Sequence, residues 1–177
     1  MQFAVVLVLA AIAAGCTSIT PTPTASSSAR SATPTSPSPS AKPSPIAGGC
    51  EKTKVYAGPG PDAARGLSGN PWAEASPPDS GVIAYFFRPP PDLLVVHPAG
   101  SEAQNKILWI VHGSATGTLT VRAHPDGAVS PVVKFTVPGG GGYPSLIDLP
   151  SPGCWHLDVS VGSVAAGLDL VVSPGPD

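Results

Sequence analysis

The sequence predicts an all-β protein whose folded part is a single antiparallel β-sandwich of about seven or eight strands. From residue 81 onward, short runs of Val, Ile, Leu and aromatic residues recur, each bounded by Gly, Pro, Asp or Asn. Several runs alternate apolar and polar residues, which is the pattern of an antiparallel sheet with one wet face. No stretch keeps the spacing of an amphipathic helix without a Gly or Pro interrupting it. Two such sheets packed face to face form a sandwich.

Seven runs carry this prediction. In the sixth, Trp155 and Leu157 face one way while His156 and Asp158 face the other. The runs are GVIAYFF (81–87), DLLVV (92–96), KILWIVH (106–112), TLTVRAH (118–124), VVKFTV (132–137), CWHLDVSV (154–161) and GLDLVVS (167–173). KILWIVH is apolar on both faces, which favours a central strand buried on both sides over a strand whose second face meets a partner.

The first fifteen residues, MQFAVVLVLAAIAAG, are almost wholly apolar and end at Cys16. A membrane-spanning helix needs about 20 apolar residues, so this run has the length of a signal-peptide core instead. Its end, Ala13-Ala14-Gly15-Cys16, resembles the lipobox of bacterial lipoproteins. The resemblance implies cleavage before Cys16, acylation of that cysteine, and a membrane-anchored protein on the extracytoplasmic face.

Three cysteines leave an odd one in a secreted protein. If Cys16 carries lipid, Cys50 and Cys154 remain as a pair in an oxidising compartment, where a structural disulfide persists. Closing a loop of roughly 100 residues contributes about 4–5 kcal/mol in the chain-entropy model. We therefore expect a Cys50–Cys154 bridge.

Three regions follow from these observations: a lipoprotein signal peptide (1–15), a lipidated Cys16 with a linker (16–49), and the β-sandwich domain (50–177). The linker is dominated by Ser, Thr and Pro, a composition that predicts a disordered tether. Its prolines favour an extended spacer that reaches up to about 100 Å, and its hydroxyl groups permit O-glycosylation.

Charge argues against nucleic acid as a partner. The chain has nine Lys and Arg against eleven Asp and Glu, and two of the basic residues, Arg30 and Lys42, lie in the linker. The remainder from residue 50 onward carries 7 − 11 = −4 charges. No basic stripe exists to meet phosphates.

Trp109 lies in a predicted central strand, and Cys154 opens a later predicted strand after PSPG. In these features the domain resembles the immunoglobulin-like sandwich across roughly residues 80 to 173. In that fold a strand-C tryptophan packs near an inter-sheet disulfide. Cys50 lies far upstream, which places it on the first strand or in the segment leading into the domain. The phrase SLIDLPSPGCWHLDVSVG (145–162) also resembles the penultimate hairpin strand of bacterial immunoglobulin-like modules found in cell-surface lipoproteins, in which a proline-glycine corner leads into an aromatic-bearing strand.

Two patterns suggest chemistry that the rest of the sequence does not support. Strand-then-His112-Gly113-Ser114 resembles the oxyanion segment of α/β-hydrolases, but no Gly-x-Ser-x-Gly elbow and no helices accompany it. Gly139 to Gly142 resemble a phosphate loop, but a strand follows in place of the helix such a loop needs. We expect no enzyme activity, no catalytic residue and no cofactor.

Four histidines, His97, His112, His124 and His156, are candidate metal ligands, but none lies within four residues of another. Their convergence on one metal would depend wholly on the tertiary fold, so we expect solvent-facing strand histidines and no metal site. Asp148 and Asp158 are too isolated for paired acid–base carboxylates. Trp72 either plugs the sandwich or marks a binding surface.

The function expected from the sequence is a lipid-anchored, non-enzymatic binding or envelope-adhesion module, with a protein or cell-wall partner. An adhesion module requires an exposed apolar patch of several hundred Å². The alternatives are an extracytoplasmic metal or small-ligand carrier and a purely structural accessory domain. A carrier requires at least three of the four histidines within about 5 Å of a common point.

Overall fold

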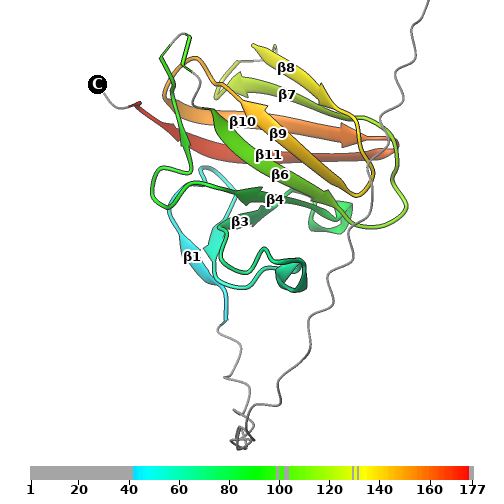
Figure 1. Cartoon of the computed structure of the whole chain (residues 1–177). Coiled ribbons are helices and arrows are strands. Elements are labelled where there is room, and N and C mark those ends of the chain that lie inside the picture. Colours follow the sequence, from blue (N-terminus) through cyan, green and yellow to red (C-terminus); the bar gives the residue numbers. More distant parts are fainter. Residues whose placement is uncertain (1–41, 99, 102–103, 129, 131, 176–177) are drawn as a thin grey trace, which may run out of the picture. The chain divides into compact units, whose positions relative to one another are not determined.

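The computed structural model describes residues 42–98, 100–101, 104–128, 130 and 132–175, which form two β-sheets (Figure 1). The first sheet has the strand order β1-β2-β3-β4-β6-β9 and the second has the order β5-β11-β10-β7-β8. The described residues contain two short 3₁₀ turns, η1 (Ala63–Arg65) and η2 (Pro78–Ser80). None of their helices is long and apolar enough to span a membrane.

The first sheet contains five strands from the first part of the domain and, at one edge, the later strand β9. Its members are β1 (Ser44–Ile46), β2 (Val55–Ala57), β3 (Trp72–Glu74), β4 (Val82–Phe86), β6 (Asn105–Val111) and β9 (Gly142–Ile147). All its neighbours pair antiparallel. Strand β1 begins within the stretch that the sequence analysis assigned to the linker, so ordered structure starts ahead of Cys50.

The second sheet contains the longest hairpin among the described residues. Its strands are β5 (Leu94–Val95), β7 (Leu119–Pro125), β8 (Val133–Val137), β10 (Gly153–Val161) and β11 (Val164–Ser173). Strands β10 and β11 pair along their length, and β7 lies on the other side of β10. The expectation of wholly antiparallel sheets is wrong at one edge, because the two-residue strand β5 pairs parallel with β11.

A single hydrophobic core lies between the two sheets, as expected for a β-sandwich. Alternate side chains of the strands point into this core, such as Trp155 and Leu157 of β10. The indole of Trp109 is fully buried in it. The Trp109 Nε1–H donates to Ser145 Oγ on β9 over 2.9 Å. All seven expected runs form strands. The sequence analysis overlooked β1, β2 and β3 as strands.

Strand β6 is buried on its core face and, at Ile110, also on its outer face, which confirms the prediction of burial on both faces for the second half of KILWIVH. Ile107 and Trp109 face the shared core, whereas Ile110 lies in a second cluster on the outer face of the first sheet. The buried members of that cluster are Leu67, Trp72, Ile83, Tyr85 and Ile110. Residues 58–71, between β2 and β3, supply Leu67 and cover this face.

A buried carboxylate holds the covering segment in place. Asp62 is 3% exposed, and its backbone N–H donates to the Tyr85 hydroxyl over 2.9 Å. The Tyr85 hydroxyl donates to Asp62 Oδ2 over 3.2 Å, and His112 Nε2 lies 3.2 Å from the same oxygen. Arg65 Nε lies 3.5 Å from Asp62 Oδ1. Burial raises the pKa of Tyr85 to about 12, and the charge of Asp62 acts in the same direction.

Candidate metal centre

The outer face of the second sheet brings two histidines together. Because side chains alternate along a strand, His156 and Asp158 of β10 both point away from the core. The β7–β10 register places His124 directly opposite His156. The two imidazole centroids lie 5.2 Å apart and their planes are tilted by 36°.

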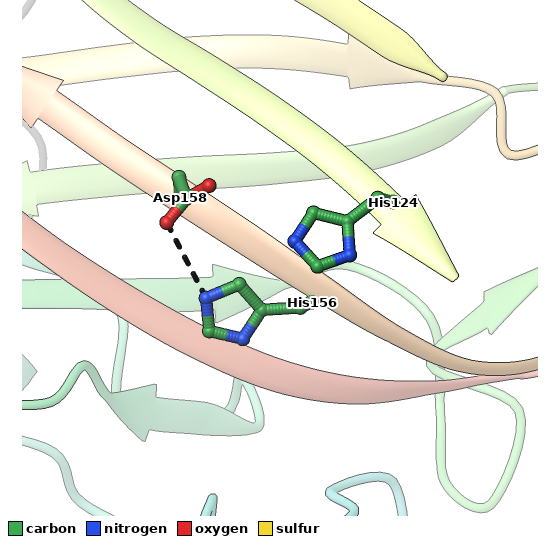
Figure 2. Close-up of side chains that lie close together, drawn as sticks. All are labelled: His124, His156 and Asp158. Carbon is green, nitrogen blue, oxygen red and sulfur yellow. Dashed lines mark ion pairs between the residues drawn. The ribbon is translucent and has the colours of Figure 1, made fainter. Parts of the chain in front are cut away.

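Asp158 completes a group of three potential metal ligands (Figure 2). One ligand atom from each of His124, His156 and Asp158 lies within 4.8 Å of the other two. His156 Nε2 is 3.4 Å from Asp158 Oδ1. His124 and His156 are half-buried and Asp158 is exposed, so the group is open to solvent.

The ring of His156 is held by a second carboxylate. Asp169 lies opposite His156 on β11, and its Oδ1 is 2.6 Å from His156 Nδ1. Because an ionised carboxylate only accepts hydrogen bonds, Nδ1 donates its proton to Asp169. Nε2 faces Asp158 Oδ1, and any proton that it shares with that oxygen must leave before Nε2 can bind a metal. Burial lowers the pKa of His156, but the hydrogen bond and charge of Asp169 and the charge of Asp158 outweigh it and raise the pKa overall.

The ring of His156 packs closely over a glycine of the neighbouring strand. Gly167 lies opposite Asp158 on β11, and a Cβ atom placed there would lie 3.0 Å from His156 Cε1 and 3.1 Å from its Nε2. A larger residue would therefore require the imidazole to shift by a few tenths of an ångström.

The second histidine is oriented by its own strand. His124 Nδ1 lies 3.2 Å from the carbonyl oxygen of Pro125. A carbonyl accepts a hydrogen bond, so Nδ1 is the donor and Nε2 is left as a free ligand atom. Both histidines therefore have one nitrogen engaged by an oxygen acceptor, which is the arrangement usual for metal-binding histidines.

A cleft of about 320 Å³ adjoins the group. His156, Asp158 and Asp169 form one wall, and residues 52 and 53, before β2, contribute to its lining. The complete lining is Lys52, Thr53, Ser76, His156, Asp158, Gly167 and Asp169. The side of the site nearest β11 is thus polar and carries charges of both signs.

The predicted disulfide is present and fastens to β10 the segment that contributes Lys52 and Thr53 to the cleft. Cys50 and Cys154 are bonded, with 6.1 Å between their Cα atoms. Cys50 lies between β1 and β2, so it follows the first strand. Cys154 alternates with Trp155 on β10 and therefore lies outside the core. The bridge does not pack in the core beside Trp109, unlike the arrangement that the immunoglobulin-like resemblance implies. Cys16 lies outside the described residues.

The four histidines do not converge. The described residues form one group of potential metal ligands, and it contains His124 and His156 only from this set. His112 directly follows β6 and pairs with Asp62 of the segment 58–71, which covers the first sheet. His97 follows β5, and its Nε2 is buried without a partner among the described atoms.

The remaining residues that the sequence analysis considered as candidates are parts of the fold outside the histidine site. Trp72 is buried in the second cluster and stacks on Tyr56 at 4.7 Å, so it is not a surface anchor. Gly139 to Gly142 lead from β8 into β9 without a helix. Asp148 accepts a hydrogen bond from Gln104. Sequence reasoning missed Asp169, although pairing the β10–β11 hairpin about Gly162 and Ser163 would have placed it opposite His156.

Comparison with known proteins adds no assignment: no protein-family model, curated protein or solved structure matches the chain.

Proposed function

We propose that the protein is a lipid-anchored, non-enzymatic binding module that holds a divalent transition metal, with Zn²⁺ the expected ion. The observation that carries the proposal is the convergence of His124, His156 and Asp158 on the outer face of the second sheet. Only two of the four histidines converge, so the criterion of three histidines is not met, and a carboxylate takes the place of the third in this metal-binding proposal.

The distances fit zinc coordination after a small adjustment. Zinc takes imidazole nitrogen and carboxylate oxygen at about 2.0–2.2 Å, so neighbouring ligand atoms of a tetrahedral site lie about 3.4 Å apart. His156 Nε2 and Asp158 Oδ1 already stand at 3.4 Å. The largest separation in the group is at most 4.8 Å, and a rotation of the exposed Asp158 and of the His124 ring closes it.

The donor set selects the class of metal. Imidazole suits zinc, copper and nickel, whereas calcium and magnesium take oxygen ligands. Three protein ligands leave a fourth position for water or an exchangeable ligand, as in zinc sites that are not purely structural. An open position suits reversible binding, which a carrier or a metal-dependent contact requires.

The proposed location rests on the chain's N-terminal pattern and on the disulfide. The lipobox-like Ala13-Ala14-Gly15-Cys16 supports an anchor in the cell membrane with the domain on the extracytoplasmic face. The Cys50–Cys154 bridge suits an oxidising compartment. A relation to immunoglobulin-like modules is supported by the two-sheet architecture and remains part of the proposal.

Calorimetric titration of the mature chain with Zn²⁺ tests the metal assignment. We expect one ion per chain in wild type, and a loss of affinity of roughly 100-fold or more in His156→Ala and in His124→Ala. His112→Ala is the matched control, because it removes another solvent-accessible histidine paired with an aspartate. Absence of binding in wild type, or an equal loss in the control, would contradict the proposal.

Intact mass spectrometry of membrane-extracted protein tests the anchor separately. We expect the mass of diacyl or triacyl groups on a chain beginning at Cys16, and a gain of one hydrogen on each bridge sulfur after reduction. An unmodified full-length chain would contradict the anchor and leave the metal assignment intact.

Adhesion is a second candidate, because two exposed apolar side chains share one row of the first sheet. Phe87 is 41% exposed and Leu146 58%, and Lys106 lies between them with its Nζ 4.6 Å from the Phe87 ring centroid. Leu146 is the register partner of Lys106. If this row contacts the cell wall, a Phe87→Ser and Leu146→Ser double variant will lose retention on isolated cell-wall sacculi, and unchanged retention would exclude this surface.

A further inference from the structure

The Cys50–Cys154 bridge is linked to the histidine site along β10. Cys154 precedes His156 by two residues, so both side chains lie on the same face of the strand. Both cysteines are half-buried. Cys154 is therefore close to His156 along β10 and lies on the same face of the sheet. Because both cysteines are only half-buried, a reductant has partial access to the sulfur atoms.

A second link runs through Asp169, the residue that orients His156. The Cys50 N–H donates to the Asp169 carbonyl over 3.0 Å. The Asp169 N–H donates to Thr53 Oγ1 over 2.7 Å. Both backbone groups of Asp169 are thus held by the segment 50–53, which the bridge fastens to β10.

The segment itself is a tight turn that a hydrogen bond closes and that the bridge fastens to β10. The Thr53 N–H donates to the Cys50 carbonyl over 3.0 Å, and Thr53 lines the cleft beside His156. Upstream, the Gly48 carbonyl accepts from the Val171 N–H. A few hydrogen bonds at a sheet edge are the kind of structure that opens locally when a covalent tie is lost.

We propose that this bridge is a redox-responsive clamp on the metal site: the site binds tightly when the bridge is closed and releases the metal when the bridge is reduced. The inference rests on the proposed function. Opening the bridge frees segment 50–53, Asp169 loses its backbone partners, and His156 loses the fixed orientation that presents Nε2.

The reaction is a thiol–disulfide exchange with an extracytoplasmic dithiol protein or small dithiol as reductant. The reductant transfers two electrons and two protons, the S–S bond of Cys50–Cys154 breaks, two thiols form, and the reductant leaves as its own disulfide. The metal keeps its charge throughout and dissociates as the divalent ion.

The test compares Zn²⁺ affinity in closed and open forms of the mature chain by competition with a chromogenic chelator. The open forms are a Cys50→Ser, Cys154→Ser double variant and wild type that has been reduced, alkylated and freed of reagent. We expect affinity to fall by about tenfold or more, the usual effect of losing an outer-shell partner of a metal ligand. Circular dichroism identifies the temperatures at which the open forms stay folded.

If the open forms unfold, the Thr53→Val variant tests the same link to the metal site without opening the disulfide. This variant retains the bridge and the side-chain shape but removes the acceptor for the Asp169 N–H, so we expect weaker Zn²⁺ binding at unchanged disulfide content. Thr136→Val, the same substitution at an exposed position of β8, is the matched control.

Each outcome has a definite meaning. Equal affinity in Thr53→Val and wild type, or in closed and folded open forms, overturns the clamp and leaves the metal site standing. Tighter binding in reduced, unalkylated protein, with a sulfur-to-cobalt absorption band after Co²⁺ substitution, also overturns it, because the thiolates would then be ligands themselves. Failure of the closed wild type to bind Zn²⁺ refutes the proposed function instead.

Discussion

The outer faces of the two sheets differ in what the sequence places on them. On the first sheet, Ile83, Tyr85 and Ile110 point outward and are covered by the chain's own residues 58–71. On the second sheet, the outward positions include His124, His156 and Asp158, and the last two line a cleft. An apolar outer face is buried by a segment of the same chain, whereas a polar one is left open to a ligand.

Each face is organised around an aspartate paired with a histidine, but the pairs act differently. Asp62 is buried, and its hydrogen bonds with Tyr85 fasten a covering segment. Asp169 is half-buried and leaves the second nitrogen of His156 available. Substitutions on the first sheet should therefore change stability, and those on the second should change metal binding.

Asp62→Ala should have the largest effect. It removes the charged acceptor of the Tyr85 hydroxyl and of His112, so we expect a loss of about 3 kcal/mol in the free energy of unfolding. Urea denaturation measures this loss, with the exposed Asp79→Ala as control. Zn²⁺ affinity should stay within twofold of wild type at a temperature where both are folded; a parallel loss of binding would show that the two faces are not independent.

Tyr85 should make the first sheet sensitive to alkaline pH. Its pKa is raised from 10.0 to about 12, so the unfolded state loses the phenolic proton first. The neutral Tyr85 stabilises the fold fully below pH 10, and that contribution of about 2–3 kcal/mol is lost as pH rises toward 12. Denaturation of wild type and Tyr85→Phe at pH 9 and pH 11.5 measures it, and an equal decline in both would refute the assignment.

Asp169→Asn should change the titration of His156 on the second sheet. Asp169 raises the pKa of His156 against the effect of burial, so the substitution should lower that pKa. Because the folded pKa is raised in wild type, the stabilisation is present at acid pH and is lost as pH rises through it. Nuclear magnetic resonance titration of the imidazole protons in metal-free protein reports the shift, and an unchanged His156 pKa would contradict the contact.

Arg122→Gln should have the smallest effect. Arg122 lies opposite Asp158 in the β7–β10 register, so its positive charge opposes a cation bound there. Its removal should tighten Zn²⁺ binding by about threefold at low salt, and less at high salt. Lys134→Gln, one strand further from the site, is the control and should change affinity less. Weaker binding in Arg122→Gln would indicate that the ion lies elsewhere.

The strands whose apolar and polar residues alternate could be predicted from the sequence. The period-two pattern of β10 correctly separates Trp155 from His156, and the doubly apolar run identifies β6 as buried on both faces. The pairing of Cys50 with Cys154 follows from counting the cysteines. The three-residue strands β1, β2 and β3 lie among prolines and glycines, where no alternation is long enough to recognise.

The site could be predicted only in part, because it depends on strand order. His156 and Asp158 share a face by alternation, and the tight turn at Gly162 implies Asp169 as a neighbour. His124 comes from a strand some thirty residues earlier along the chain, and periodicity does not say that β7 lies beside β10. The sequence alone therefore does not predict that His124 and His156 lie side by side.

Anomalous diffraction from crystals of the mature protein grown with Zn²⁺ tests the central claim most directly. Data collected on both sides of the zinc absorption edge should give one strong peak about 2 Å from nitrogens of His124 and His156 and from an oxygen of Asp158. A map with these three side chains well defined and no peak between them, or with its strongest peak beside His112 and Asp62, would contradict the claim.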